Sequence, residues 1–173
     1  MRKVLVVIDM QNDFIDGSLG TKEAVGIVEN VKKKIASYPA GDIYATRDTH
    51  EVVYMSTSEG RHLPVEHCIR GTKGWEIRED VAAAMPEAII IDKPTFGSVE
   101  LAKLLEEENR KEELELELVG LCTDICVASN ALLLKAAMPE ITIRVDASCC
   151  AGVTPESHEA ALTTMRMCQI EVA

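Results

Sequence analysis

The chain has 173 residues, a formal net charge of −11 and a sequence pI of about 4.8. Its 18 lysines and arginines are scattered and form no basic stripe, which argues against a nucleic-acid surface. No apolar stretch reaches membrane-spanning length, and the apolar run 4–8 is too short for a signal peptide. The length suits one domain, so we expect a single domain over residues 1–173.

The six cysteines form no Cys-x-x-Cys pair and no spacing typical of secreted domains. Disulfides are rare in reducing compartments, where cysteines are more often catalytic or metal-binding. We therefore expect reduced thiols and a cytoplasmic protein.

Aliphatic runs alternate with amphipathic segments along the chain. The run 4–8 is continuous and mostly β-branched, which is typical of a parallel strand buried on both faces. Predicted strands are 3–9, 42–47, 88–91, 114–121, 141–146 and a short one within 169–172. Predicted helices are 25–37, 75–85, 99–109, 123–137 and 154–167. This alternation predicts a Rossmann-like, three-layer α/β/α sandwich with a mostly parallel sheet of five to six strands. Residues 51–74 show no periodicity and read as a long functional or disordered loop.

Reactive side chains follow the first four predicted strands. In chain order they are Asp9, Asp48 with His50, Lys93 and Cys126. The carboxyl ends of parallel strands meet at the edge where open α/β sheets bind ligands. Because convergence of so many reactive groups by chance is improbable, we expect an active site at this edge.

Cys126 lies in the first turn of the helix predicted from Thr123, which Thr123 or Asp124 could cap. A helix N-terminus stabilises an anion, so a thiolate is favoured at this position. A buried structural cysteine is the alternative interpretation.

A thiol nucleophile needs a base, a nearby cation and donors for an oxyanion. Asp9 is the candidate base and Lys93 the candidate cation. The backbone amides of Cys122 and Cys126 are the candidate donors. The alternatives are that Asp9 only forms a turn and that Lys93 is a solvated surface residue.

A second group of side chains has the composition of a metal site. Two imidazoles and two carboxylates suit Zn²⁺, and also Fe²⁺ or Mn²⁺. The four candidate ligands are Asp48, His50, Glu59 and His67. The alternative is a set of polar loop residues without a metal. His62 is a weaker ligand candidate, and His158 is expected to be solvated.

Five segments, in this order, resemble the isochorismatase-like cysteine hydrolases, and most of all the nicotinamidases, which are also pyrazinamidases. The segments are IDMQNDF (8–14), TRDTH (46–50), LPVEHC with GT (63–68 and 71–72), DKP (92–94) and GLCTDICV (120–127). The resemblance spans nearly the whole chain and implies the isochorismatase-like fold.

The resemblance implies a catalytic triad of Asp9, Lys93 and Cys126, and a non-proline cis peptide bond before Cys122. It also implies a metal site at Asp48, His50 and His67, with Glu59 as a further ligand. Phe14 and Phe96 would flank a flat ring whose pyridine nitrogen the metal holds.

The implied reaction is hydrolysis of nicotinamide to nicotinate and ammonia through a thioester. A metal-free isochorismatase-like, carbamoyl or other small-amide hydrolase is the first alternative. A non-catalytic binding protein is the second. The expected partner is a small-molecule amide, with neither nucleic acid nor a membrane, and we expect a homo-oligomer.

Overall fold

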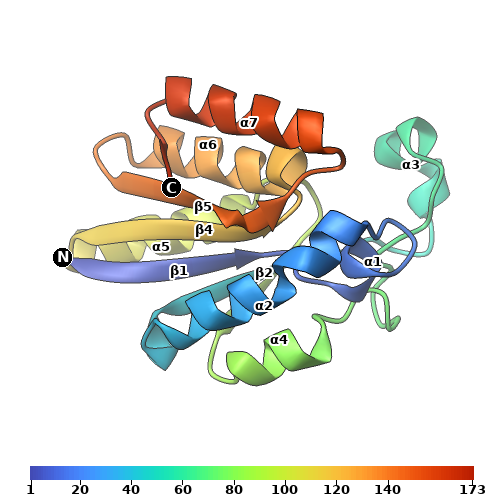
Figure 1. Cartoon of the computed structure of the whole chain (residues 1–173), viewed down its shortest axis with the longest axis horizontal. Coiled ribbons are helices and arrows are strands. Elements are labelled where there is room, and N and C mark those ends of the chain that lie inside the picture. The colour runs from blue at the N-terminus through green and yellow to red at the C-terminus, as the bar shows by residue number, and fades with distance from the viewer.

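The computed structural model describes residues 1–173, as one parallel sheet between two layers of helices (Figure 1). The strands are β1 (Arg2–Ile8), β2 (Ile43–Asp48), β3 (Ile89–Lys93), β4 (Leu114–Leu121), β5 (Thr142–Ala151) and β6 (Glu171–Val172). The α-helices are α1 (Asn12–Ile15), α2 (Lys22–Ala36), α3 (Ser58–His62), α4 (Glu79–Ala84), α5 (Val99–Lys111), α6 (Ala128–Ala137) and α7 (Pro155–Met167). Two 3-10 turns, η1 (Ala40–Asp42) and η2 (Tyr54–Ser56), and a π-helical turn, η3 (Thr123–Val127), complete the fold. None of the helices combines the length and the apolar character that crossing a membrane requires.

The strand order is β3-β2-β1-β4-β5-β6, and every neighbouring pair is parallel. The predicted sheet of five to six mostly parallel strands is therefore confirmed. Successive strands β1, β2 and β3 extend the sheet in one direction, and β4, β5 and β6 extend it in the other. The direction of strand addition therefore reverses between β1 and β4. A crevice opens at the carboxyl ends of strands at such a reversal. These ends lie on the right of Figure 1, beside α1 and α3.

Both faces of the sheet are buried, which explains the continuous aliphatic runs in the sequence. In β1, Val4, Val6 and Ile8 face the layer formed by α5, α6 and α7. Leu5 and Val7 face the opposite layer, which contains α2 and α4. The alternation anchors the central strand rigidly and so fixes where its carboxyl end lies.

Gly120 allows β4 to approach β1 closely just before the active-site edge. Its φ is +119°, and a Cβ there would lie 2.1 Å from the carbonyl oxygen of Ile8. Only glycine accommodates both conditions without strain. The pairing of β4 with β5 shifts in register between Leu118 and Gly120, and it resumes at Gly120 with Cys150.

Several predicted boundaries were wrong. The fifth strand extends to Ala151 instead of ending at residue 146, because pairing with β4 resumes after the register shift. The helix predicted over 25–37 is α2, which begins at Lys22, where the Thr21 side chain accepts a hydrogen bond from the amide of Ala24. The helix predicted over 123–137 begins as the π-helical turn η3 and continues as α6.

The helix predicted over 75–85 covers only Glu79–Ala84. Trp75 and Glu76 belong to a turn, and Ile77 forms an antiparallel bridge with Gln11, so the helix begins only after it. The segment 51–74 is partly helical, since it contains η2 and α3 within an otherwise irregular path. The bridge to Gln11 is a contact with a distant part of the chain, which local periodicity does not report.

Candidate active site

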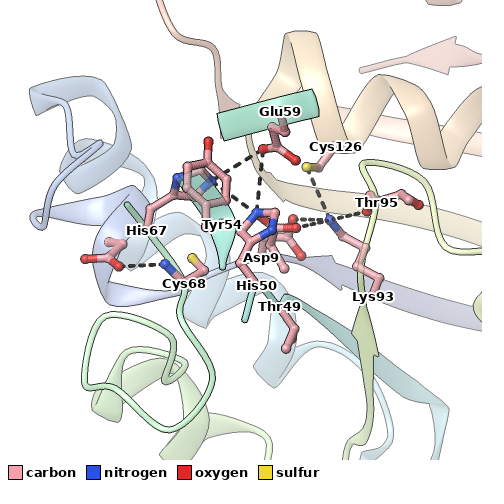
Figure 2. A network of polar contacts seen from close by, with 12 residues as sticks. Asp9, Thr49, His50, Tyr54, Glu59, His67, Cys68, Lys93, Thr95 and Cys126 are labelled. Atoms are coloured by element: carbon pink, nitrogen blue, oxygen red, sulfur yellow. Dashed lines mark hydrogen bonds and ion pairs between the residues drawn. The ribbon is translucent and has the colours of Figure 1, made fainter. Parts of the chain in front are cut away.

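Three side chains from different strand ends meet in the crevice between β1 and β4. Asp9 follows β1, Lys93 ends β3, and Cys126 lies in η3 directly after β4. The Lys93 Nζ is 2.7 Å from Asp9 Oδ2 and donates a hydrogen bond to Cys126 Sγ at 3.3 Å. It also donates to the carbonyl of Thr95 at 3.2 Å. Figure 2 shows the Lys93 ammonium between the thiol and the Asp9 carboxylate.

The Asp9 carboxylate is fully buried, and its two oxygens differ in their hydrogen bonding. Its Oδ1 accepts a 2.6 Å hydrogen bond from the Thr46 hydroxyl. Its Oδ2 makes no hydrogen bond of good geometry, although Lys93 lies close to it. The residue has a φ of +47°, which is uncommon for a residue with a side chain. One carboxylate oxygen is therefore left in the crevice to accept a proton.

Burial and neighbouring charge set the protonation of these groups. Burial raises the pKa of the Cys126 thiol well above its ordinary value, the Asp9 carboxylate raises it further, and Lys93 opposes both. Burial also raises the pKa of Asp9, against the lowering effect of Lys93. Burial lowers the pKa of Lys93, but Asp9 and Cys126 outweigh it and raise the pKa above its ordinary value. Burial and Asp9 therefore favour the protonated thiol in the free protein, against the anion-stabilising effect expected at a helix N-terminus.

The backbone around Cys122 presents an unused donor. The Leu121–Cys122 peptide bond is cis. The amides of Ile125 and Val127 both donate to the Cys122 carbonyl, at 3.1 and 3.0 Å, while the Cys122 amide donates to no group in the chain. An amide without a partner at the start of η3 can bind a negatively charged oxygen.

The predicted side-chain cap of this turn was wrong. The residue at the N-cap position is Cys122, and no side chain caps the turn. Asp124 instead accepts a hydrogen bond from the amide of Val153 at 3.1 Å. This contact ties η3 to the segment that follows β5.

The four candidate metal ligands lie beside the three groups described above. Each offers one ligand atom, and these atoms lie within 4.8 Å of one another: Asp48, His50, Glu59 and His67. The Nε2 of His50 is 3.0 Å from Asp48 Oδ2 and 3.6 Å from Glu59 Oε1. The Nε2 of His67 is 3.6 Å from both of the same oxygens. Figure 2 shows His50, His67 and Glu59 pointing toward a shared centre.

The chemistry of this cluster fits a divalent cation. Asp48 presents Oδ2 to both imidazoles, while its buried Oδ1 makes no hydrogen bond and lies 3.6 Å from the Lys93 ammonium. His67 Nδ1 donates to the carbonyl of Val65 at 2.8 Å, so Nε2 is the nitrogen that faces the carboxylates. Burial lowers the pKa of His67, but Asp48 and Glu59 outweigh it and raise the pKa to about 10. A cation bound by two imidazoles and two carboxylates would neutralise this excess of negative charge.

Two buried residues that were not predicted as functional support this cluster. Tyr54 packs its ring edge-on against His50 and His67, with centroids 4.7 and 5.0 Å apart. The Gln11 side chain brackets Asp48, donating to its carbonyl at 2.8 Å and accepting from its amide at 2.7 Å. Gln11 lies in a segment that carried a family motif, but its role depends on β2 lying alongside β1.

One cavity of about 660 Å³ joins the two groups. It is lined by Cys122 and Cys126 on one side and by the four candidate ligands on the other. The structure brings both candidate ring-binding residues to this cavity. Phe14 is buried, with its ring 5.6 Å from that of His67, whereas Phe96 is 44% exposed. His62 also lines the cavity, but it is exposed and outside the ligand cluster.

His158 was expected to be solvated, and this expectation was wrong. Its side chain is only 16% exposed, and its Nδ1 hydrogen-bonds Oγ1 of the fully buried Thr123 at 2.7 Å. Gly152 allows the His158 side chain to pack at this position, because a Cβ on residue 152 would lie 2.9 Å from His158 Cβ. The contact joins α7 to the residue that follows Cys122.

A thiol, an ammonium and a carboxylate gathered at the carboxyl edge of a parallel α/β sheet form a set of groups suited to nucleophilic catalysis. The family model of the isochorismatase domain matches residues 3–173. The chain therefore belongs to the isochorismatase family.

Individual relatives agree with this assignment. The chain is 28% identical over 145 residues to PncA of Bacillus subtilis strain 168, described as an uncharacterized isochorismatase family protein; the alignment covers 76% of this chain and 78% of that protein. The crystal structure of nicotinamidase/pyrazinamidase PncA from Bacillus subtilis is similar with a TM-score of 0.82, at 26% identity over 100% of both chains. The pyrazinamidase of Pyrococcus horikoshii in complex with zinc is similar with a TM-score of 0.78, at 27% identity over 100% of this chain and 99% of that one.

Proposed function

We propose that the protein hydrolyses nicotinamide to nicotinate and ammonia through a thioester on Cys126. The observation that carries this proposal is the single cavity that joins the Asp9–Lys93–Cys126 contact to a four-ligand cluster. The similarity to nicotinamidase and pyrazinamidase structures at 26–27% identity supports the same substrate class.

The first half of the reaction begins with a proton transfer. Asp9 Oδ2, the buried oxygen without a hydrogen bond, takes the proton from Cys126 as the sulfur attacks the carboxamide carbon. The amides of Cys122 and Cys126 hold the oxyanion. Asp9 then gives the proton to the departing nitrogen, so ammonia leaves and the thioester remains.

The second half reverses the roles of the same groups. Asp9 takes a proton from water, the water oxygen attacks the thioester carbon, and the proton returns to the Cys126 sulfur as nicotinate leaves. The Lys93 ammonium contacts both the carboxylate and the sulfur, at 2.7 and 3.3 Å. The ammonium can therefore stabilise the negative charge whether it lies on the Asp9 carboxylate or on the Cys126 sulfur.

Asp48, His50, Glu59 and His67 would hold a divalent cation, and zinc is the first choice over iron or manganese. Such a cation acts as a Lewis acid and would bind the pyridine nitrogen of the substrate. The buried ring of Phe14 lies beside His67 and offers an apolar wall for the flat ring of the substrate.

The direct test is ammonia release from nicotinamide, with benzamide and an N-carbamoyl amino acid as comparison substrates. We expect nicotinamide to be hydrolysed faster than benzamide, because benzamide has no ring nitrogen. Hydrolysis of the carbamoyl compound alone would replace the proposed substrate with a carbamoyl one. No amide hydrolysis by metal-loaded protein would contradict the proposed function.

The metal cluster predicts a specific loss of binding. We expect the purified protein to bind about one equivalent of a divalent cation per chain, and His67→Ala to lose it, because one of four ligands is removed. Elemental analysis after dialysis measures the stoichiometry. His62→Ala is the matched control for metal content, since His62 is exposed and outside the cluster. Full metal content in His67→Ala would remove this residue from the ligand set.

The Thr123–His158 contact predicts a positioning effect on the turn that bears Cys126. Thr123→Val leaves the His158 nitrogen without its partner, which we expect to lower kcat about tenfold with little change in KM. Thr123→Ser keeps the hydroxyl and should restore kcat. Steady-state kinetics with nicotinamide separate the two constants. A rise in KM alone, or no recovery with serine, would contradict a positioning role.

A further inference from the structure

The cavity is larger than the proposed reaction requires. Its volume of about 660 Å³ lies within the range of roughly 300–1,000 Å³ typical of pockets for drug-sized ligands. Nicotinamide is one ring with one carboxamide and fills only part of such a space.

Large apolar side chains form part of the cavity lining, beside polar residues such as Ser58, His62 and Thr95. We call four of the apolar residues the apolar collar: Leu19, Leu63, Phe96 and Ile125. Leu63 and Phe96 are 38% and 44% exposed, whereas Cys126 and His67 at the interior are buried. The collar residues come from four separate segments: the α1–α2 connection, the end of α3, the β3–α5 connection and η3. Large apolar side chains that line a cavity, two of them half-buried and two exposed, indicate an apolar ligand group.

Buried anchors fix the two exposed members of the collar. The carbonyl of Leu63 accepts a 2.8 Å hydrogen bond from the hydroxyl of the fully buried Tyr54. The carbonyl of Phe96 accepts from the fully buried Asn130 at 3.1 Å, and the same Asn130 amide donates to the Cys126 carbonyl at 2.8 Å. The collar is therefore attached to the same buried framework as the ligand cluster and Cys126.

We propose that the apolar collar is a subsite for an apolar ring substituent, so that substituted aromatic amides are better substrates than nicotinamide itself. This rests on the proposed function, because the carboxamide must lie at Cys126 and the ring nitrogen at the ligand cluster. With those two points held, position 5 of the pyridine ring is directed away from both. A substituent there can reach the mouth and remove the exposed surfaces of Leu63 and Phe96 from water.

The test compares nicotinamide with 5-phenylnicotinamide by ammonia release, and nicotinate with 5-phenylnicotinate by calorimetric binding. We expect the phenyl amide to have a kcat/KM at least about tenfold higher, mainly through a lower KM, and the phenyl acid to bind more tightly by a similar factor. Two ratios of phenyl to unsubstituted compound are measured, one of kcat/KM for the amides and one of affinity for the acids. Leu63→Ser should reduce both ratios several-fold. Val52→Ser, which is 81% exposed and does not line the cavity, is the matched control and should leave both ratios unchanged.

The outcomes separate the subsite from the reaction. Hydrolysis of nicotinamide with equal or poorer use of the phenyl amide overturns the subsite and leaves the proposed function standing. No hydrolysis of either amide, with tighter and Leu63-dependent binding of the phenyl acid, overturns the proposed function and supports the subsite. If Leu63→Ser changes the elution volume of the protein but neither ratio, the collar is a contact between copies and the subsite is overturned.

Discussion

Replacing Cys126 with alanine is expected to lower the rate of nicotinamide hydrolysis by at least about four orders of magnitude, because no thioester can form. The Cys126 side chain is buried and accepts a hydrogen bond from Lys93, which also contacts Asp9, and no other thiol has this contact. Single-turnover ammonia release, compared with the rate without enzyme, measures the loss. Mass spectrometry of wild-type protein quenched during turnover should show the nicotinoyl adduct on Cys126.

Cys168→Ser is the matched control, since Cys168 is exposed and lies at the end of α7, outside the cavity. It should retain wild-type activity and the same adduct. Activity of Cys126→Ala within about tenfold of wild type would remove the nucleophile assignment. An adduct on another cysteine would identify that cysteine as the nucleophile instead of Cys126.

Replacing Lys93 with methionine is expected to lower the free energy of unfolding by about 3–5 kcal/mol at pH 8 and to abolish activity. The side chains of Lys93 and Asp9 are fully buried, so the variant leaves a carboxylate without its counter-charge. Burial already raises the pKa of Asp9, and removal of the ammonium raises it further. Urea unfolding at pH 5 and pH 8 measures the difference from wild type.

The sign of the pH effect follows from the protons bound in each state. Above the unfolded carboxyl pKa of about 3.9, the folded variant holds a proton on Asp9 that the unfolded chain has lost. The deficit of Lys93→Met should therefore grow as the pH rises from 5 to 8. The double variant Asp9→Asn/Lys93→Met should recover part of the stability. Lys103→Met, at an exposed position in α5, should be neutral, and a pH-independent deficit would contradict the buried ion pair.

The fold was predictable because its signals are local. Continuous aliphatic runs such as 4–8 identify strands buried on both faces, and the helices between them require parallel pairing. Parallel pairing then places Asp9, Lys93 and Cys126 at one edge. Their meeting was therefore predictable from chain order alone, before any distance was known.

Other features of the site depend on contacts that no local pattern reports. The partner of Thr123 is His158, which belongs to a helix whose polarity indicated solvent exposure. The raised pKa of the Cys126 thiol follows from burial and from the Asp9 carboxylate, which oppose the expected effect of a helix N-terminus. The role of Gln11 depends on the alignment of β1 with β2. In each case a long-range contact changes what the local sequence indicated.

The Lys93 ammonium lies 2.7 Å from Asp9 and 3.6 Å from Asp48, so it joins the nucleophilic group to the ligand cluster. A lineage that lost the cluster by changing Asp48 would leave this buried ammonium with one carboxylate instead of two. The charge beside the nucleophile would change as well, although no residue of that group had been altered. The two halves of the site therefore constrain each other during sequence divergence.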